Sequence, residues 1–263
     1  MIRILVVDDS AFSRKVITRI LENLPGVQIA DTACDGQEAI RKTLTVRPDL
    51  ITLDLEMPNM DGFTFLRWVM NSTPTPVIVV SSKEADENVF KAMDLGALDF
   101  VVKPTPHLSM ELEEIQANLI EKVLAVPLFK QKRTREKMQT ESLLFREQLT
   151  RAIPAEKPLL IAIASSTGGP PAIQNILREL PPSFDVPLVI AQHMPRTFTG
   201  LFAERLNQHT SLHVKEAAHG ETLRPGFVYI APGGAHLLVR RNADSFRVEI
   251  RSKEDGIRYQ PSA

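Results

Sequence analysis

Short apolar runs alternate with amphipathic stretches along the first part of the chain. The apolar runs have the length and composition of buried strands and lie at residues 2–8, 27–33, 50–55, 76–82 and 99–104. The amphipathic stretches have apolar residues three and four apart and predict helices at residues 11–24, 36–46, 62–71, 86–96 and 109–124. Strict alternation of strand and helix is typical of a parallel sheet covered on both faces, so we expect a doubly wound α/β domain.

The same alternation returns in the second half of the chain. Strands are expected at residues 158–164 and 187–193, with helices at residues 171–181 and 199–209. Short alternating strands with glycine turns follow at residues 212–217, 226–232, 235–241 and 246–252. This part is therefore expected to be a second α/β domain, Rossmann-like at its start and richer in β-structure toward its end.

A charged segment separates the two halves. Residues 129–153 have no strand signal and no glycine, and their helix formers suit an exposed helical connector. The segment is net positive and the first domain net negative, but a solvated charged helix is favoured over a linker held against that domain. We expect a first domain at residues 1–122, a charged and largely helical linker at 123–156, and a second domain at 157–263.

Composition excludes several classes of protein. A net charge of -1, with 43% hydrophobic and 24% charged residues, is ordinary for a globular protein and argues against nucleic acid as a partner bound through bulk charge. The apolar run at the N-terminus is too short for a signal peptide or a spanning helix, so we expect a cytoplasmic protein with no membrane insertion. Cys34 has no metal-ligand spacing around it and is interpreted as a small, semi-buried side chain.

Acidic residues gather where two of the expected strands end. Asp8 and Asp9 follow the first strand, and Asp54 ends the third. In a doubly wound sheet of order 2-1-3-4-5, these strands are neighbours and their carboxyl ends meet at the topological switch point. Three carboxylates in one crevice repel one another unless a cation lies among them, and hard oxygen ligands suit Mg²⁺. The alternative, three exposed acids with no shared role, is the less favoured one.

Further polar side chains end the fourth and fifth strands. Lys103 offers a point charge for phosphoryl oxygens, and Pro104 after it offers a cis peptide that would aim the lysine. Ser81 offers a hydroxyl at the same edge. A strand-end lysine or serine alone is usually just solvated. Together with the acids, however, these residues describe a carboxylate that accepts a phosphoryl group beside a metal ion.

These residues resemble the receiver domain of two-component response regulators, over residues 1 to about 122. The resemblance implies a flavodoxin-like fold and phosphorylation of Asp54, which adds charge and acceptor oxygens that change the surface of the fourth and fifth strands. The Mg²⁺ ligands that it implies are Asp8, Asp9, Asp54 and the backbone carbonyl of Glu56. The residues that it implies respond to the phosphoryl group are Ser81, Phe100 and Lys103.

The stretch IAIASSTGGPPAI at residues 161–173 is open to three interpretations: a phosphate loop, a nucleophile turn, or a plain strand-to-helix bend. No lysine follows the glycines and no G-x-G-x-x-G pattern is present, which excludes the common phosphate loops. Pro170 or Pro171 would suit the first turn of an ordinary helix. A nucleophile needs a base nearby, and His193 follows the next strand just as Ser166 follows this one. That matching position favours the nucleophile turn.

The motifs SSTGG, QHMP and YIAPGGAH at residues 165–169, 192–195 and 229–236 resemble the catalytic domain of the chemotaxis protein-glutamate methylesterase (CheB) family. In this family a receiver precedes that domain, so the resemblance covers nearly the whole chain. It implies Ser166 as nucleophile, His193 as general base and Thr167 as a contributor to the oxyanion site, with no cofactor in the esterase site. Ser165 is the rival nucleophile, and Ser166 is favoured because it precedes Thr-Gly-Gly.

One departure from the family concerns the end of the chain. The family's triad aspartate lies in a PSVD-like segment, whereas this chain stops at PSA, residues 261–263. The catalytic domain is therefore expected to be incomplete, in a form shortened naturally or by engineering. Without an acid to orient His193, turnover falls by roughly 10⁴-fold, so we predict that the 263-residue chain is nearly inactive.

The favoured function is an esterase whose inhibition is relieved when the receiver is phosphorylated. By resemblance, a chemotaxis-type histidine kinase is the phosphodonor, and methylated chemoreceptors are the substrate for demethylation of glutamyl methyl esters and deamidation of glutamines. One alternative is a DNA-binding output, but the chain ends in short strands rather than a helix-turn-helix. The other is a shortened, non-enzymatic phosphoreceiver that acts as a binding partner or phosphate sink.

Overall fold

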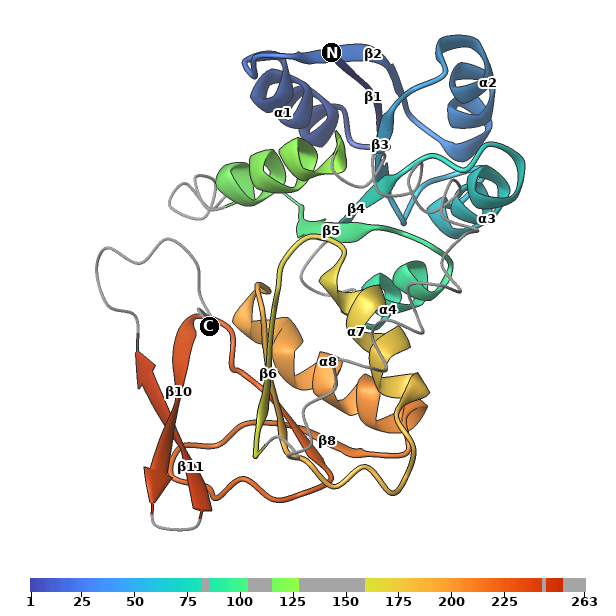
Figure 1. The fold of residues 1–263 in the computed structure, drawn as a ribbon. Coiled ribbons are helices and arrows are strands. Elements are labelled where there is room, and N and C mark those ends of the chain that lie inside the picture. Colours follow the sequence, from blue (N-terminus) through green and yellow to red (C-terminus); the bar gives the residue numbers. More distant parts are fainter. Residues whose placement is uncertain (82–85, 104–114, 128–158, 243–244, 253–263) are drawn as a thin grey trace, which may run out of the picture. The chain divides into compact units, whose positions relative to one another are not determined.

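In the computed structural model, the chain forms two compact units, Met1–Ile153 and Pro154–Ala263 (Figure 1). The structure describes residues 1–81, 86–103, 115–127, 159–242 and 245–252. The expectations for Pro104, for most of the linker and for the PSA end fall outside the described residues. Each unit is built around its own parallel sheet.

Five parallel strands form the sheet of the first unit, in the order β2-β1-β3-β4-β5 (Figure 1). They are β1 (Ile2–Val7), β2 (Val27–Ala33), β3 (Leu50–Asp54), β4 (Val77–Ser81) and β5 (Asp99–Val102). Every residue of β3 and β4 is buried, which is why these strands appear in the sequence as continuous apolar runs. The order confirms the doubly wound, flavodoxin-like fold and brings the carboxyl ends of β1 and β3 together.

Helices cover both faces of this sheet. They are α1 (Ala11–Glu22), α2 (Gly36–Val46), α3 (Gly62–Ser72), α4 (Asp86–Asp94) and a helix over residues 115–127. The helix at 115–127 packs with α1 on one face, and Figure 1 shows α2 and α3 on the other. This helix continues past residue 122, and Val123 and Val126 are buried in the core that it shares with α1. The helix is thus part of the first unit to its last turn.

The first turns of three helices carry side-chain caps. Ser10, Asp35 and Asp61 precede α1, α2 and α3, and each accepts a hydrogen bond from the backbone N–H three residues along the chain. Such caps satisfy backbone donors that have no partner within the helix. The Ser10 cap starts α1 directly after the two aspartates that follow β1.

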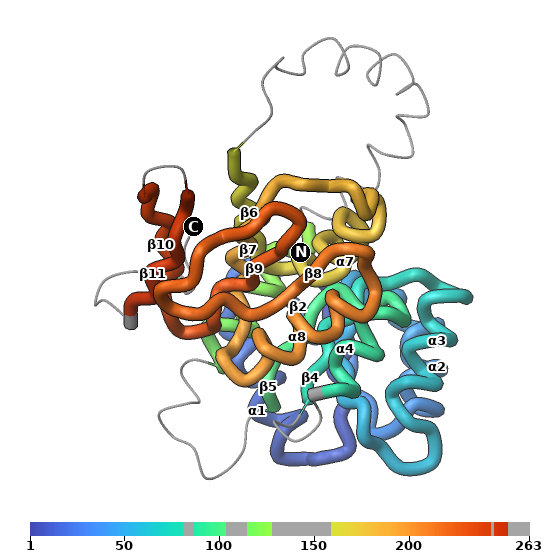
Figure 2. Tube along the Cα trace, turned by 90° about the horizontal axis from the view of Figure 1, so that it is seen from below, coloured from blue at the N-terminus to red at the C-terminus, as the bar shows by residue number. Residues whose placement is uncertain are grey.

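The second unit has a four-stranded parallel sheet in the order β6-β7-β9-β8 (Figure 2). Its strands are β6 (Ile161–Ser165), β7 (Leu188–Gln192), β8 (His213–Glu216) and β9 (Phe227–Ile230). The helices α7 (Gly169–Glu179) and α8 (Arg196–His209) follow β6 and β7, and β10 (Ala235–Asn242) and β11 (Ser245–Ser252) form an antiparallel hairpin. Val248 of the hairpin is buried with Val189 and Tyr229 of the sheet, so the hairpin covers a sheet face.

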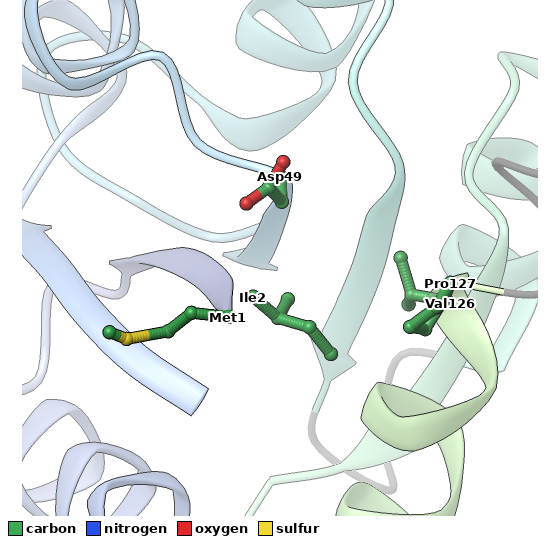
Figure 3. Close-up of a pocket in the computed structure, with 5 residues that line it drawn as sticks. All are labelled: Met1, Ile2, Asp49, Val126 and Pro127. Carbon is green, nitrogen blue, oxygen red and sulfur yellow. The ribbon is translucent and has the colours of Figure 1, made fainter. Parts of the chain in front are cut away.

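Three further observations concern Cys34, a surface hollow and the described helices. Cys34 is exposed in the turn between β2 and α2, so its interpretation as a semi-buried side chain was wrong. A shallow hollow of about 190 Å³ opens at the amino-terminal edge of the first sheet, and its lining is mostly apolar (Figure 3). Among the described helices, none is both long and apolar enough to cross a membrane.

Candidate functional site

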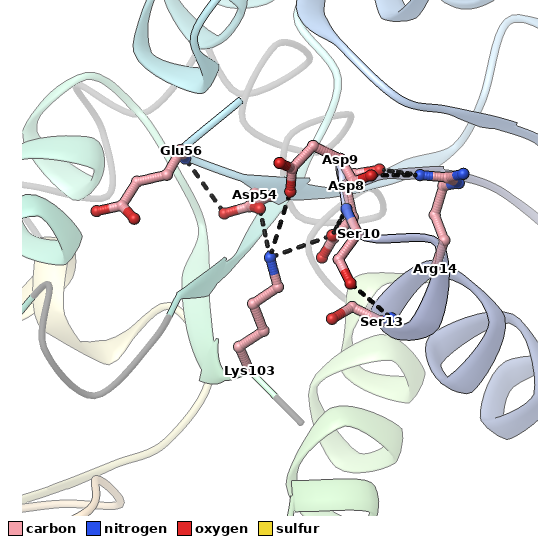
Figure 4. Close-up of polar contacts among 8 residues, drawn as sticks. All are labelled: Asp8, Asp9, Ser10, Ser13, Arg14, Asp54, Glu56 and Lys103. Atoms are coloured by element: carbon pink, nitrogen blue, oxygen red, sulfur yellow. Dashed lines mark hydrogen bonds and ion pairs between the residues drawn. The ribbon is translucent and has the colours of Figure 1, made fainter. Parts of the chain in front are cut away.

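Three aspartates meet at the carboxyl edge of the first sheet (Figure 4). Asp8, Asp9 and Asp54 each offer a carboxylate oxygen, and these oxygens lie within 4.8 Å of one another. Asp8 and Asp54 are buried, whereas Asp9 is exposed and open to solvent. Asp8 Oδ2 is buried without a hydrogen-bond partner in the described part of the chain. A buried carboxylate oxygen of this kind, beside two further carboxylates, fits a hard divalent cation.

Lys103 lies at the centre of this cluster (Figure 4). Its Nζ is 2.5 Å from Asp54 Oδ2, 3.1 Å from Asp8 Oδ1 and 3.8 Å from Asp9 Oδ1. Its backbone N–H donates to the carbonyl of Ser81 at 2.7 Å, which ties the end of β5 to the end of β4. The lysine predicted for this edge is therefore in direct contact with all three predicted carboxylates.

The electrostatics of the cluster show that it holds more negative charge than one lysine balances. Burial, reinforced by the nearby charge of Asp54, raises the pKa of Asp8 to about 6. Burial also raises the pKa of Asp54, although its hydrogen bond with Lys103 pulls in the opposite direction. Burial lowers the pKa of Lys103, but its bonds to Asp54 and Asp8 outweigh that effect and leave the pKa raised. A bound cation would relieve the repulsion between these carboxylates.

Backbone contacts hold the acidic side chains in place. The N–H of Glu56 donates to Asp54 Oδ1 at 3.2 Å, and the N–H of Ser10 donates to Asp8 Oδ1 at 2.8 Å. Arg14 Nη1 donates to the carbonyl oxygens of Asp8 and Asp9, at 2.5 and 3.1 Å. Sequence reasoning missed Arg14; its place one turn into the helix after the two aspartates is the only signal that pointed to it.

The two remaining receiver residues lie on neighbouring strands. Ser81 is buried at the end of β4, one residue beyond Val80, which pairs with Asp54 in the sheet register. Phe100 is buried in β5, opposite Val79. The sheet thus places Ser81 next to the acidic cluster and Phe100 on the adjoining strand.

In the second unit, Ser166 and His193 come together. Ser165 pairs with Gln192 in the parallel register of β6 and β7, so the next residue of each strand reaches the same edge. Ser166 Oγ lies 3.4 Å from His193 Nδ1, and the N–H of His193 donates to the Ser165 carbonyl at 2.9 Å. A serine hydroxyl beside an imidazole is the arrangement from which an activated nucleophile is built, and such contacts are often long in enzymes without substrate.

The neighbours of Ser166 differ in their hydrogen bonding. Ser165 Oγ donates to Gln192 Oε1 at 2.7 Å and is therefore engaged away from His193. Thr167 Oγ1 is buried without a hydrogen-bond partner among the described residues, which leaves a hydroxyl donor beside Ser166. Gly168 follows with φ of 72°, a left-handed conformation that glycine adopts without strain, and α7 begins one residue later.

Two protein-family models match the chain. The response regulator receiver domain matches residues 4–113, and the CheB methylesterase domain matches residues 161–263. These matches and the two sheets define the class: a response regulator whose receiver is followed by a methylesterase domain with a parallel sheet.

Close relatives identify the family within that class. The chain is 44% identical to protein-glutamate methylesterase/protein-glutamine glutaminase 3 of Geobacter sulfurreducens, over 99% of this chain and 75% of the relative. It is 39% identical to the protein-glutamate methylesterase/protein-glutamine glutaminase of Bacillus subtilis, over 100% of this chain and 76% of the relative. The chain belongs to this family, the CheB family, and spans about three quarters of the length of these relatives.

Solved structures from the same family are also similar. The response regulator domain of Thermotoga maritima CheB is 40% identical to this chain, with a TM-score of 0.44. The match covers 48% of this chain and 96% of that domain. The Thermotoga maritima CheB methylesterase catalytic domain is 38% identical to this chain, with a TM-score of 0.38. The match covers 41% of this chain and 57% of that domain.

Proposed function

We propose that the chain is a phosphorylation-regulated esterase of bacterial chemotaxis. It hydrolyses glutamyl methyl esters and deamidates glutamines, the two activities that the names of its relatives give for those proteins. The substrates in this proposal are methylated chemoreceptors. The observation that carries the proposal is the 3.4 Å approach of Ser166 Oγ to His193 Nδ1 at matching ends of two parallel strands. The engaged hydroxyl of Ser165 supports Ser166 as the nucleophile.

The reaction follows from this pair. His193 takes the proton of Ser166 Oγ as the oxygen attacks the ester carbonyl carbon, and Thr167 Oγ1 donates to the oxyanion that forms. When the tetrahedral intermediate collapses, the bond to the methoxy group breaks and His193 returns the proton to release methanol. His193 then takes a proton from water as the water attacks the acyl-serine, and returns it to Ser166 Oγ as the glutamate leaves. With a glutamine substrate, ammonia leaves in place of methanol.

The receiver supplies the regulation. In the proposal, Asp54 accepts a phosphoryl group from a chemotaxis-type histidine kinase, while Asp8, Asp9, Asp54 and the Glu56 carbonyl hold Mg²⁺. When bound, the ion neutralises charge on the phosphoryl oxygens. Lys103, which is bonded to Asp54, is positioned to contact a phosphoryl oxygen. In the proposal the Ser81 hydroxyl moves toward the phosphoryl group, and the side chain of Phe100 repacks in response.

The division of the chain is part of the same proposal. It comprises a receiver at residues 1–122, a linker at 123–156 and a catalytic domain at 157–263. The buried side chains of Val123 and Val126 favour extending the receiver to residue 127. We place the protein in the cytoplasm, where a kinase and the receptors' signalling regions are both available to it.

The experiment is methanol release from methylated receptor membranes, with and without acetyl phosphate as the phosphodonor, at enzyme concentrations high enough to follow the slow turnover predicted for the 263-residue chain. Ser166→Ala is expected to abolish release, whereas Ser165→Ala retains most of it; loss only in Ser165→Ala would overturn the assignment. Asp54→Ala is expected to stay at basal activity both with and without acetyl phosphate. Activation of that variant by acetyl phosphate would contradict regulation through Asp54.

The predicted near-inactivity of the 263-residue chain stays a prediction, because the end of the chain lies outside the described residues. Reaction of Ser166 with a fluorophosphonate probe, detected by mass spectrometry, measures the nucleophile without receptor substrate. Brisk methanol release from the 263 residues would contradict the near-inactivity while leaving the esterase proposal in place. A chain that binds the kinase but reacts with neither probe nor receptor would be the non-enzymatic phosphoreceiver.

A further inference from the structure

We propose that Gln192 is a positioning residue that holds the nucleophile and base loops of the esterase in register, an inference that rests on the proposed function. Gln192 ends β7 and is 1% exposed, next to His193 in the chain and opposite Ser165 in the sheet. The hydrogen bonds of its side chain run to two backbone carbonyls and to the Ser165 hydroxyl. Its influence on the reaction would pass through the backbone of the two loops.

Both ends of the Gln192 amide are bonded across the site. Nε2 donates to the Ser166 carbonyl at 3.0 Å and to the His193 carbonyl at 3.1 Å. Oε1 accepts from the Ser165 hydroxyl at 2.7 Å. Because the two carbonyls can only accept, the nitrogen must face them, which determines the orientation of the amide. One side chain thereby links the backbone of the nucleophile to the backbone of the base.

Gly169 makes room for this amide. A Cβ at Gly169 would lie 2.0 Å from Gln192 Oε1 and 2.9 Å from Ser165 Cβ, so any larger residue would displace one of them. Close packing of the first residue of α7 on the amide explains why glycine occurs at position 169. Gly168 is a glycine for a different reason, its left-handed backbone conformation. The amide is thus held both by its hydrogen bonds and by close packing against Gly169.

The link has a consequence for catalysis because Ser166 Oγ and His193 Nδ1 are already 3.4 Å apart. Losing the amide would remove the one side chain that bonds to both part-buried carbonyls, although the Ser166 carbonyl would still accept the N–H of Gly169 at 2.8 Å. A displacement of about 1 Å between the two loops costs roughly 100-fold in rate. Since Gln192 does not contact the substrate in this scheme, the loss should fall on kcat. KM should stay within about twofold.

The test compares Gln192→Met, which keeps the length of the side chain but not its hydrogen bonds, with Gln208→Met at an exposed position of α8. Both variants and the wild type are assayed for the rate at which fluorophosphonate labels Ser166. They are also assayed for kcat and KM on methylated receptor, at enzyme concentrations high enough to follow the slow turnover predicted for the 263-residue chain. Thermal melting confirms that each protein is folded at the assay temperature. We expect Gln192→Met to lose about 10- to 100-fold in kcat and in labelling rate, with Gln208→Met at the wild-type rate.

Gly169→Ala provides a second variant that keeps the Gln192 amide but pushes against it. We expect it to slow labelling as well, and the two losses to be less than additive in the double variant, because both substitutions act through the same amide. A folded Gln192→Met that labels at the wild-type rate, or one whose loss lies in KM, would overturn the inference alone. A wild type that does not label at Ser166 would instead overturn the proposed function and the inference with it.

Discussion

Lys103 Nζ lies 2.5 Å from Asp54 Oδ2 and 3.1 Å from Asp8 Oδ1, so one ammonium group is bonded to both buried carboxylates of the receiver. Lys103→Met removes the group that lowers the pKa of Asp54 and leaves burial to raise it further. We expect phosphorylation by acetyl phosphate and Mg²⁺ to slow by at least about 10-fold at neutral pH and to recover in part at higher pH.

The measurement is phosphoryl uptake followed by intact-protein mass spectrometry from about pH 6 to pH 9. Lys91→Met, at an exposed position of α4, is the matched control and should leave uptake unchanged. An unchanged rate in Lys103→Met would show that the ion pair has no part in phosphorylation.

Asp8 carries a stability cost that a neutral residue would remove. The pKa of its carboxyl is about 6 in the folded chain, against an ordinary value of 3.8, so the folded state binds more protons than the unfolded state between these values. Stability therefore falls as the pH rises through that window. Asp8→Asn is expected to stabilise the cation-free receiver by about 1–3 kcal/mol at pH 7 and to have little effect near pH 4.

Urea unfolding at both pH values, without divalent cations, measures this difference. Calorimetric titration with Mg²⁺ should show the opposite change, since Asp8→Asn removes a ligand and wild-type affinity declines as the pH drops below about 6. Asp9→Asn is the control: Asp9 is exposed, so it should lose cation binding without gaining stability. Equal stabilisation by both substitutions would contradict a role for burial.

Much of this architecture follows from the sequence because burial on both faces makes a strand a continuous apolar run. The strands β3 and β4 are buried throughout, and both were located within a residue or two. Once the strands are placed, the polar residues that end them must share an edge, which brings Asp8 to Asp54 and Ser166 to His193. The residues that meet in the two sites could therefore be predicted from the polar residues at the ends of the strands.

What the sequence did not reveal depends on tertiary contacts of single polar side chains. Gln192 and Lys122 look like ordinary polar residues of a strand end and a charged helix, yet both are buried among specific partners. Alternation also could not show that β8 and β9 join the parallel sheet beside β7, since short strands carry no signal for their neighbours. Partner choice of this kind is decided by the folded chain as a whole.

Gly62 lies against the strand that carries the proposed phosphoacceptor. A Cβ at this position would be 2.2 Å from the Asp54 carbonyl oxygen and 2.7 Å from Leu55 Cα, both backbone atoms that cannot rotate away. We expect Gly62→Ala to destabilise the receiver by about 1–3 kcal/mol and to slow phosphorylation of Asp54, because the end of β3 must shift.

The matched control is Gly200→Ala in α8, where a Cβ meets nothing within 4 Å. Alanine there should stabilise its helix by about 0.5–1 kcal/mol, the ordinary gain from replacing a helical glycine. Thermal and urea unfolding report both effects. If Gly62→Ala is as stable as the wild type, the close approach to Asp54 is not a constraint on this sequence.

Lys122 and Asp99 form a buried ion pair that joins the helix at residues 115–127 to β5. Lys122 Nζ is 2.5 Å from Asp99 Oδ1, their side chains are 4% and 1% exposed, and the same ammonium lies 5.3 Å from the centre of the Phe100 ring. Lys122→Met leaves the Asp99 carboxylate buried without this counter-charge, at a cost of about 3–5 kcal/mol. The double variant with Asp99→Asn leaves neither charge behind, so it should be more stable than Lys122→Met alone.

Urea unfolding of the two single variants and the double variant gives the coupling between the residues, and additive losses would show that the pair does not act as a unit. Because the pair adjoins Phe100, Lys122→Met should also reduce the activation of methanol release by acetyl phosphate, whereas Lys91→Met should not.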